Sequence, residues 1–399
     1  MKFAILVPDG MADYPIEQLG NRTPLEVAKT PNMDWIVQNG ILGRVNTIPK
    51  TLTPASDVAN MSILGYDPLK YYSGRGPLEA ANLGVELAED EVAFRCNLVT
   101  TSEEIMIDYS AGHISSNEAK VLIEYLDENL GSSECRFYPG ISYRHLVVIK
   151  DRGLNLDKLR CTAPHDLLNK NFLKNYPKGD NAKIIIDLMN KSKELLTNHE
   201  INKVRVDLGE NPANMIWLWG QGRNPSMPTF KEKYNKTGAV ISAVDLIKGL
   251  GRIIGLEVIN VPGATGYYDS DLAAKARFGI KALEKKDFVF IHVEATDEAG
   301  HNGDLRMKIS SIERFDELVV SPFVNYFRKS KAGFRLLVIP DHATPLSLRT
   351  HTSDTVCFAM VGEAIEHNGF SGFSEQKALE SNIYFSTGSS LIEYFFKEA

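Results

Sequence analysis

Residues 2–10 read KFAILVPDG, a short apolar run that ends in proline, aspartate and glycine. An apolar run of this length without polar alternation is typical of a strand that is buried on both faces of a sheet. Residues 287–293 (DFVFIHV) and 334–339 (FRLLVI) have the same character, and a loop that contains aspartate follows each of them. We therefore predict three parallel strands whose carboxyl ends carry acidic residues.

The segments between these strands favour helices. Residues 240–256 and 271–283 are rich in Ala, Leu, Ile and Lys, and their apolar positions recur at helical spacing. Strands that alternate with helices are typical of a doubly wound α/β sheet, in which the strands are mostly parallel. This is the fold class that we predict.

A change of pattern in the middle of the chain indicates an inserted domain. The chain has 399 residues, which is too long for one ordinary core. Between residues 76 and 230, short β-like pieces such as 144–149 (RHLVVI) and 215–219 alternate with polar segments and two helical patterns. We expect a smaller α+β domain at 76–230 that binds substrate, between the two parts of a metal-binding domain at 1–75 and 231–399. Residues 220–228 (GQGRNPSMP) have the composition of a return linker.

Composition argues against several classes of partner. The formal net charge is −7 and no long run of Lys and Arg is present, so we expect no nucleic-acid partner. No apolar run reaches the length of about 18 residues that spans a bilayer, and the first residues do not resemble a signal peptide. We expect a cytoplasmic enzyme with no membrane partner. The four cysteines are scattered, and we interpret them as reduced residues without a catalytic role.

Aspartate and histidine follow each predicted strand. Since the carboxyl ends of parallel strands meet at one edge of a sheet, we expect these side chains to converge. Asp297 and His301 are four residues apart, which places both on one face of a helix. The candidate metal ligands at this edge are Asp9, Asp297, His301, Asp341, His342 and His351.

Each of these residues has an ordinary structural explanation when it is taken alone. An aspartate after a strand often caps a helix or forms a turn, and a single histidine is often a satisfied polar residue. Together, however, three aspartates and three histidines at one edge would repel each other or stay unsatisfied without cations. The combination therefore favours a site for two divalent metal ions.

Ser56 is the candidate nucleophile, in the stretch TLTPASDVANMSILG at residues 51–65. It follows a loop and precedes a helical pattern, and the free N–H groups at a helix N-terminus favour an anion such as a phosphate. The alternative is that Ser56 only caps this helix. Lys275 is a candidate for neutralising charge that develops in the reaction, and its alternative role is that of an exposed helical lysine.

These motifs resemble those of the archaeal-type cofactor-independent phosphoglycerate mutases, which belong to the alkaline phosphatase superfamily. The resemblance extends over nearly the whole chain. It is carried by the motifs LVPDGMAD, SDVANMSILGYDP, YYSGRGPLEAANLGVEL, AFRCN, ISAVDLIKGLGRIIGLEVINVPGATGYYDSD, HVEATDEAGHNGD, IPDHATP and HTSD. It implies an alkaline-phosphatase-like sheet with an inserted domain.

The resemblance also implies a role for each candidate residue. One metal ion would be held by Asp297, His301 and His351. The other would be held by Asp9, Ser56, Asp341 and His342. Ser56 would accept the phosphate from one glycerate hydroxyl and return it to the other, with Lys275 beside it. The expected contacts to the substrate are Arg75, His113, Arg144, His145 and Arg223.

Two stretches depart from the family pattern. An arginine-rich DRRAGRI-like stretch is here DYSAGHI at residues 108–114, and an LLRGAG-like stretch is LWGQGR at 218–223, so two expected arginines are absent. His113 and Arg223 are the residues that would compensate. A bacterial branch of the family has been proposed to act as a homoserine kinase, and this chain resembles that branch too.

We expect an intramolecular phosphotransferase that interconverts 3-phosphoglycerate and 2-phosphoglycerate. Transfer to another alcohol such as homoserine, or to water, is the main alternative. A protein that keeps the metal-stabilised fold for binding alone is a more distant one, because all the expected ligands are present. The donor set suits Mn²⁺ or Mg²⁺ best, with Zn²⁺ or Co²⁺ as further candidates. The expected partner is a small phosphorylated substrate.

Overall fold

The computed structural model describes residues 1–397, which form two compact units. The first unit joins Met1–Tyr72 to the chain from Met227 onward, and the second is Ser73–Ser226. The boundaries that we predicted, after residues 75 and 230, lie three and four residues from these. The roles that we assigned to the two parts stay predictions.

An eight-stranded sheet forms the centre of the first unit. The four strands β11, β1, β10 and β8 lie side by side and are all parallel, while β12 is antiparallel to both of its neighbours. The strands in spatial order are β13 (Tyr384–Phe385), β2 (Ile41–Val45), β12 (Val356–Gly362), β11 (Phe334–Val338), β1 (Lys2–Pro8), β10 (Phe288–Val293), β8 (Gly238–Ile241) and β9 (Glu257–Val258).

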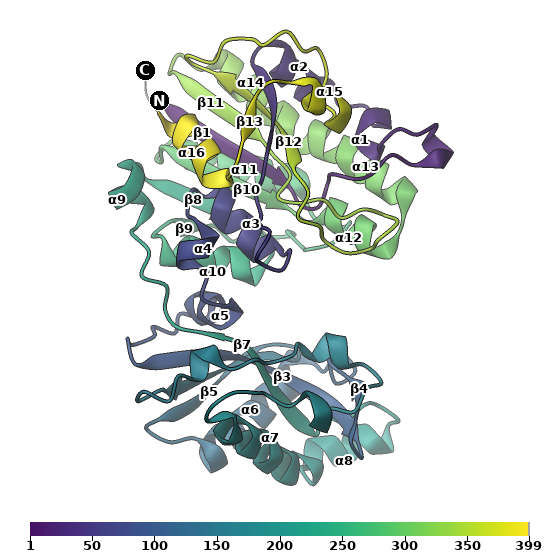
Figure 1. Cartoon of the computed structure of the whole chain (residues 1–399), viewed down its shortest axis with the longest axis vertical. Coiled ribbons are helices and arrows are strands. Elements are labelled where there is room, and N and C mark those ends of the chain that lie inside the picture. The colour runs from purple at the N-terminus through teal and green to yellow at the C-terminus, as the bar shows by residue number, and fades with distance from the viewer. Residues whose placement is uncertain (398–399) are drawn as a thin grey trace. The chain divides into compact units, whose positions relative to one another are not determined.

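Helices cover both faces of this sheet, as Figure 1 shows. Ala4 and Leu6 of β1 point into the main core on one face, while Phe3 packs against Phe395 and Phe396 on the other. Helices that pack into the main core are α1 (Pro24–Val27), α2 (Pro31–Gln38), α11 (Leu272–Leu283), α12 (Ala295–Asn302), α13 (Leu305–Phe315), the π-helical turn η5 (Asp316–Val320), α14 (Ser321–Lys329) and α15 (Glu375–Glu380). The remaining helices are η1 (Glu17–Leu19), α3 (Ser56–Ile63), α4 (Pro68–Tyr71), α9 (Phe230–Tyr234), α10 (Asp245–Ile253) and α16 (Gly388–Phe396).

The doubly wound α/β prediction and its three parallel strands are confirmed. The helix predicted over residues 271–283 is also present, as α11. The prediction of a single helix over residues 240–256 is wrong at its start. Gly238–Ile241 forms strand β8, which pairs with β10, and the helix begins only at Asp245. The β-branched residues Val240 and Ile241 fit a fully buried strand, and burial in the sheet outweighed the helical spacing that follows.

The second unit is built on a five-stranded antiparallel sheet. Its strands are β3 (Glu91–Ser102), β4 (Ile105–Asp108), β5 (Cys135–Ile141), β6 (Arg144–Lys150) and β7 (Met215–Gly222). Its helices are α5 (Arg75–Leu83), α6 (Ser116–Leu130), α7 (Ala182–Thr197), α8 (Glu200–Asp207) and the 3₁₀ turns η2 (Leu156–Lys158), η3 (Pro164–Leu167) and η4 (Leu173–Asn175). Across residues 1–397, no helix is both long enough and apolar enough to cross a membrane.

Alternation along β3 separates the two faces of this second sheet. Phe94 and Cys96 belong to the large apolar core that α6 and α7 cover. Ala93 packs with Ala80 of α5 on the opposite face. Since successive strand residues point to opposite faces, Arg95 shares the face of Ala93. The register of the sheet therefore decides which polar side chains lie together.

Candidate active site

The residues predicted to bind metal all lie in the first unit, at one edge of its sheet. Strand β1 lies between β10 and β11, and Asp9, Asp297 and Asp341 come just after these three strands. The backbone N–H of Gly10 donates to Oδ1 of Asp341 at 3.0 Å, which ties two of the loops together. The parallel topology thus gathers residues that are more than 300 positions apart in the chain.

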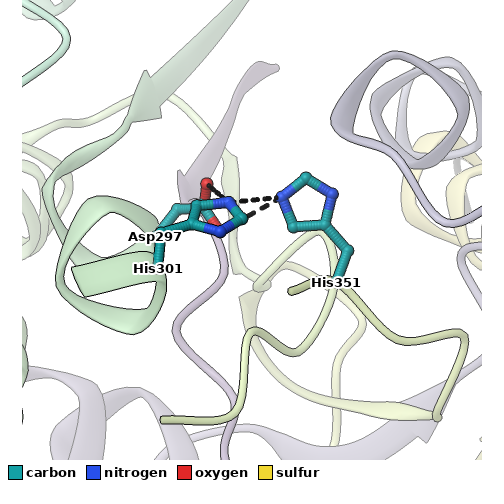
Figure 2. Close-up of side chains that lie close together, drawn as sticks. All are labelled: Asp297, His301 and His351. Carbon is teal, nitrogen blue, oxygen red and sulfur yellow. Dashed lines mark hydrogen bonds and ion pairs between the residues drawn. The ribbon is translucent and has the colours of Figure 1, made fainter. Parts of the chain in front are cut away.

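Asp297, His301 and His351 form the first cluster, which Figure 2 shows. Asp297 and His301 lie one turn apart on α12, as predicted, and His351 reaches them from the loop that follows β11. Nε2 of His301 lies 3.1 Å from Oδ2 of Asp297. Nε2 of His351 lies 3.5 Å from Oδ1 of the same carboxylate and 2.9 Å from Nε2 of His301. One carboxylate and two imidazole nitrogens therefore lie close enough together to hold one metal ion.

The first cluster has the donor geometry of a metal site. Nδ1 of His301 lies 3.0 Å from the carbonyl oxygen of Arg349, which can only accept a hydrogen bond. Nδ1 therefore carries a proton, and in the neutral ring Nε2 presents a lone pair toward Asp297 and His351. Lone pairs that face each other across 2.9 Å need a proton or a cation between them. A carboxylate and two imidazoles suit a divalent transition metal.

Asp9, Asp341 and His342 form the second cluster, with Ser56 beside it. Nε2 of His342 lies 3.3 Å from Oδ1 of Asp9 and 3.5 Å from Oδ2 of Asp341. The hydroxyl oxygen of Ser56 lies 3.1 Å from the same nitrogen. Asp9 also groups with Asp297 and His342, so the two clusters are contiguous.

The charges in the second cluster also fit a cation. Burial raises the pKa of Asp9 well above its usual value, and the negative charges of Asp341 and Asp297 raise it further. Burial acts against ionisation of Asp341 as well, but the neighbouring His342 and His292 lower its pKa to about 2. Oδ1 of Asp9 is buried and has no hydrogen-bond partner among residues 1–397. A divalent cation would satisfy this oxygen and let both carboxylates stay ionised.

The hydroxyl of Ser56 is available for chemistry. Ser56 is the first residue of α3, and the N-cap position belongs to Ala55, so the interpretation of Ser56 as a simple cap is wrong. Asn60 lies one turn further along the same helix. Its side-chain amide donates to the carbonyl oxygen of Ser56 and to Oδ2 of Asp341, both at 2.8 Å. Asn60 therefore links the helix of the predicted nucleophile to a predicted metal ligand.

Three buried residues at this site were missed by sequence reasoning: Asn60, His292 and Glu294. Asn60 had a usable signal, because it stands four residues after Ser56 on one helical pattern. His292 and Glu294 stand in the strand-end motif HVEATDEAGH, but alternation along a strand does not reveal which polar residues face a neighbour. Only the pairing of β10 with β1 shows that His292 lies beside Val7 and so close to Asp9.

Lys275 lies on α11 and is completely buried, so its interpretation as an exposed helical lysine is wrong. Its ammonium group donates to Oε2 of Glu294 at 2.5 Å and to the carbonyl oxygen of His292 at 2.9 Å. Those are its hydrogen-bond partners among residues 1–397. Lys275 thus reaches the predicted metal ligands through these two residues, and its direct catalytic role stays a prediction.

The second unit holds a separate cluster of cations and aromatic rings. The guanidinium carbon of Arg95 lies 4.6 Å from the centre of the Trp219 ring, and that of Arg75 lies 5.7 Å from the same point. Arg95 also forms an ion pair with Glu79, at 3.2 Å. Burial lowers the pKa of Arg95, and the positive charges of Arg75 and Arg144 lower it further. Three guanidinium groups are therefore close in space.

Polar aromatic side chains border this arginine cluster, which we define as Arg75, Arg95 and Arg144. The ring of Tyr143 contacts Arg144, His113 and Tyr109. His165 contacts Trp219 and Tyr109, and burial together with the charges of Arg75 and Arg95 lowers its pKa. Of the predicted substrate contacts, Arg75, Arg144 and His113 are brought together here. Arg95, His165 and Trp219 were not predicted.

His145 and Arg223 lie elsewhere in the second unit. His145 pairs with Cys96 across the sheet and shares its buried face, opposite to Arg144, and burial lowers its pKa to about 3. Arg223 forms ion pairs with Asp151 at 2.5 Å and with Asp157 at 3.1 Å. The expectation that these two residues join Arg144 and Arg75 does not agree with this arrangement. His145 points to the face opposite Arg144 because successive strand residues alternate. Arg223 is held by the carboxylates of Asp151 and Asp157.

Comparisons with known proteins agree with this architecture. A family model described as 2,3-bisphosphoglycerate-independent phosphoglycerate mutase matches residues 37–202. A protein of that name from Methanosarcina mazei is 50% identical over 100% of both chains. A probable enzyme of that name from Geobacter sulfurreducens is 46% identical, over 98% of this chain and 99% of the relative.

Two solved structures share the fold of this chain. A protein from Pyrococcus horikoshii has a TM-score of 0.84 at 28% identity, over 100% of this chain and 98% of that one. A cofactor-independent phosphoglycerate mutase from Thermoplasma acidophilum has a TM-score of 0.69 at 26% identity, over 99% of both chains. These likenesses extend over both units of the chain.

Proposed function

This chain belongs to the family of 2,3-bisphosphoglycerate-independent phosphoglycerate mutases, and we propose that it interconverts 3-phosphoglycerate and 2-phosphoglycerate through a phosphorylated Ser56. The observation that carries the proposal is the position of the Ser56 hydroxyl. It lies 3.1 Å from His342, at the margin of a donor set that suits two cations. A nucleophile beside such a set is the arrangement that phosphoryl transfer requires.

The donor atoms divide between two metal positions. We propose that Asp297, His301 and His351 hold one divalent ion, and that Asp9, Asp341, His342 and Ser56 hold the other. When bound, such a pair lowers the pKa of a hydroxyl and stabilises negative charge on phosphoryl oxygens. Mn²⁺ or Mg²⁺ is the metal that we propose, because carboxylate, hydroxyl and imidazole donors occur together here.

The residues of the chain have distinct tasks in the transfer. Oγ of Ser56 gives up its proton and forms a bond to phosphorus while the bond from phosphorus to the C3 oxygen of the substrate breaks, and that oxygen takes up one proton in turn. The glycerate then presents its C2 hydroxyl, and the same steps run in reverse. Because Ser56 opens α3, free N–H groups of the first turn favour the phosphate that it carries. Asn60 keeps this helix aligned with Asp341.

We propose that the arginine cluster of the second unit binds the anionic groups of the substrate. Guanidinium groups bind carboxylate and phosphate with two parallel hydrogen bonds, and three of them match the charge of a phosphorylated acid. His113 borders this cluster through Tyr143, in the stretch where the family pattern has arginine. Arg223 is not included, since two carboxylates hold it.

A coupled assay tests the proposed function directly. The protein is stripped with a chelator and reloaded with Mn²⁺. It is then given 3-phosphoglycerate without any bisphosphoglycerate, and enolase reports the formation of 2-phosphoglycerate. We expect turnover that depends on the added metal. Metal-loaded protein without turnover would contradict the proposal, and phosphate release or transfer to homoserine would then identify another acceptor for the same serine.

A further inference from the structure

His292 is the buried histidine next to the second cluster, and neither the sequence motifs nor the family resemblance gave it a role. It stands near the end of β10 and is fully buried. Its Nε2 atom lies 3.3 Å from Oδ2 of Asp9 and 3.7 Å from Oδ2 of Asp341. This nitrogen has no hydrogen-bond partner among residues 1–397. It therefore points at the carboxylates of two proposed metal ligands.

The other side of the His292 ring faces a carboxylate that stays ionised. Oε1 of Glu294 lies 3.3 Å from Nδ1 of His292 and accepts a hydrogen bond from the backbone N–H of Ala243 at 2.7 Å. Oε2 of Glu294 accepts from Lys275. This ion pair, at 2.5 Å between two buried groups, keeps Glu294 in its carboxylate form. A carboxylate can only accept, so Nδ1 carries the proton.

This tautomer decides what Nε2 can do. In a neutral ring with a proton on Nδ1, Nε2 presents a lone pair to the carboxylates of Asp9 and Asp341. A lone pair facing two carboxylates at these distances is repulsive unless a proton or a metal cation lies between them. When one ring nitrogen of a histidine binds a metal ion, the other ring nitrogen usually donates its hydrogen to a carboxylate or carbonyl group, which orients the ring.

We propose that His292 is a further ligand of the metal ion held by Asp9 and Asp341, with Glu294 as the residue that orients its ring. Lys275 is then a positioning residue, which holds Glu294 through its ammonium group and the backbone of His292 through a second hydrogen bond. This inference rests on the proposed function only in that both require a metal ion at Asp9. It accounts for an ammonium group that is completely buried beside a metal centre.

Pulsed electron paramagnetic resonance of bound Mn²⁺ tests the proposal by counting directly bound nitrogens. The double variant His301→Ala and His351→Ala removes the imidazoles of the first cluster, so a remaining Mn²⁺ ion reports the second. We expect couplings from two imidazole nitrogens, those of His292 and His342. Adding His292→Gln should leave one. A single nitrogen before that change, or no bound Mn²⁺ in the double variant, would overturn the proposal.

The orienting role of Glu294 is tested by metal affinity in the otherwise intact protein. Glu294→Gln and Lys275→Met should each raise the dissociation constant for Mn²⁺, by about 10- to 100-fold for the first, as is typical of residues that support a ligand. His145→Gln is a matched control, because His145 is also buried, its Nε2 has no hydrogen-bond partner among residues 1–397, and it lies in the second unit. Its metal affinity should equal that of the wild type. Unchanged affinity in both Glu294→Gln and Lys275→Met would overturn the orienting role.

The same variants separate two roles for Lys275. If Lys275 acted on the developing charge itself, Lys275→Met would lower kcat while metal affinity stayed unchanged, and that result would contradict the positioning role. Two nitrogen couplings in the double variant, together with a metal-loaded wild type that shows no mutase turnover, would leave the His292 ligand in place and remove the proposed function. Mutase turnover in the wild type, together with a single nitrogen coupling in the double variant, would keep the proposed function and overturn the His292 ligand.

Discussion

The two units of this chain gather their polar residues in different ways. In the first unit, the metal-binding candidates follow neighbouring parallel strands, so the edge of the sheet brings them together. In the second unit, the cations stand within or beside antiparallel strands, and the face to which each points decides whether they meet. Arg144 and His145 are adjacent in sequence yet lie on opposite faces.

This difference explains why the candidate residues of the two units were predicted unevenly. A residue just past a parallel strand lies at the same edge whatever the register of pairing. A residue within an antiparallel strand changes faces when the register shifts by one position. Chemistry at strand ends can therefore be recognised in a sequence, whereas chemistry on a strand face depends on pairing.

The largest expected effect is on the nucleophile of the first unit. Ser56→Ala should reduce mutase turnover by at least about 10⁴-fold, because no other oxygen would accept the phosphate. Bound Mn²⁺ should be retained, since carboxylate and imidazole ligands remain. Ser62→Ala, on the same helix, is the control and should keep its turnover. Turnover in the Ser56 variant close to that of the wild type would remove this serine from the mechanism.

A buried ion pair of the first unit should contribute strongly to the free energy of unfolding. Lys308 is fully buried, and its ammonium group donates to Asp13 at 2.6 Å and to the carbonyl oxygen of Thr344 at 2.7 Å. Lys308→Met leaves the Asp13 carboxylate buried without its cation, which should cost about 3–5 kcal/mol in the free energy of unfolding. Urea denaturation measures this loss. Lys120→Met breaks an exposed ion pair in the second unit and should leave the midpoint unchanged.

A pH effect of intermediate size is expected at Glu375. Burial of its carboxyl group raises its pKa from 4.5 to about 7. Between these values the unfolded chain loses the proton while the folded chain keeps it. Stability should therefore fall as the pH rises from 4.5 to 7, by at most about 3 kcal/mol. Denaturation at several pH values should show this slope, and Glu375→Gln should flatten it. An equal slope in both proteins would contradict the assignment.

The smallest effect is expected at the arginine cluster. Arg144→Gln removes one guanidinium group and should lower kcat/KM for 3-phosphoglycerate by roughly 30-fold, or about 2 kcal/mol, as expected for a hydrogen bond to a charged group. The change should appear mainly in KM. Arg136→Gln, at an exposed ion pair with Asp127 in the same unit, is the control. Equal values for both variants would show that the cluster does not bind substrate.

Particular residues show how far the sequence alone could be interpreted. The spacing of Asp297 and His301 predicted one helical face, and α12 has it. The sequence predicted that Ser56 lies at the start of a helix. Only the structure shows that Ala55 is the N-cap residue and that the Ser56 hydroxyl lies beside His342. Lys275 was a candidate for neutralising charge on its motif, and the resemblance placed it beside Ser56. Its complete burial and its bond to Glu294 follow from how α11 packs on β10, and no sequence pattern reports that contact.

The sequence by itself determined the parallel strands, the acidic edge of the sheet and the family of the chain. These depend on local patterns, namely apolar runs and the residues that immediately follow them. Only the tertiary structure decided that His292 and Glu294 lie at the second cluster, that Arg95 joins the cations of the second unit and that Arg223 is neutralised. The reason is physical: each of these depends on a contact between segments far apart in the chain, and packing and register set those contacts.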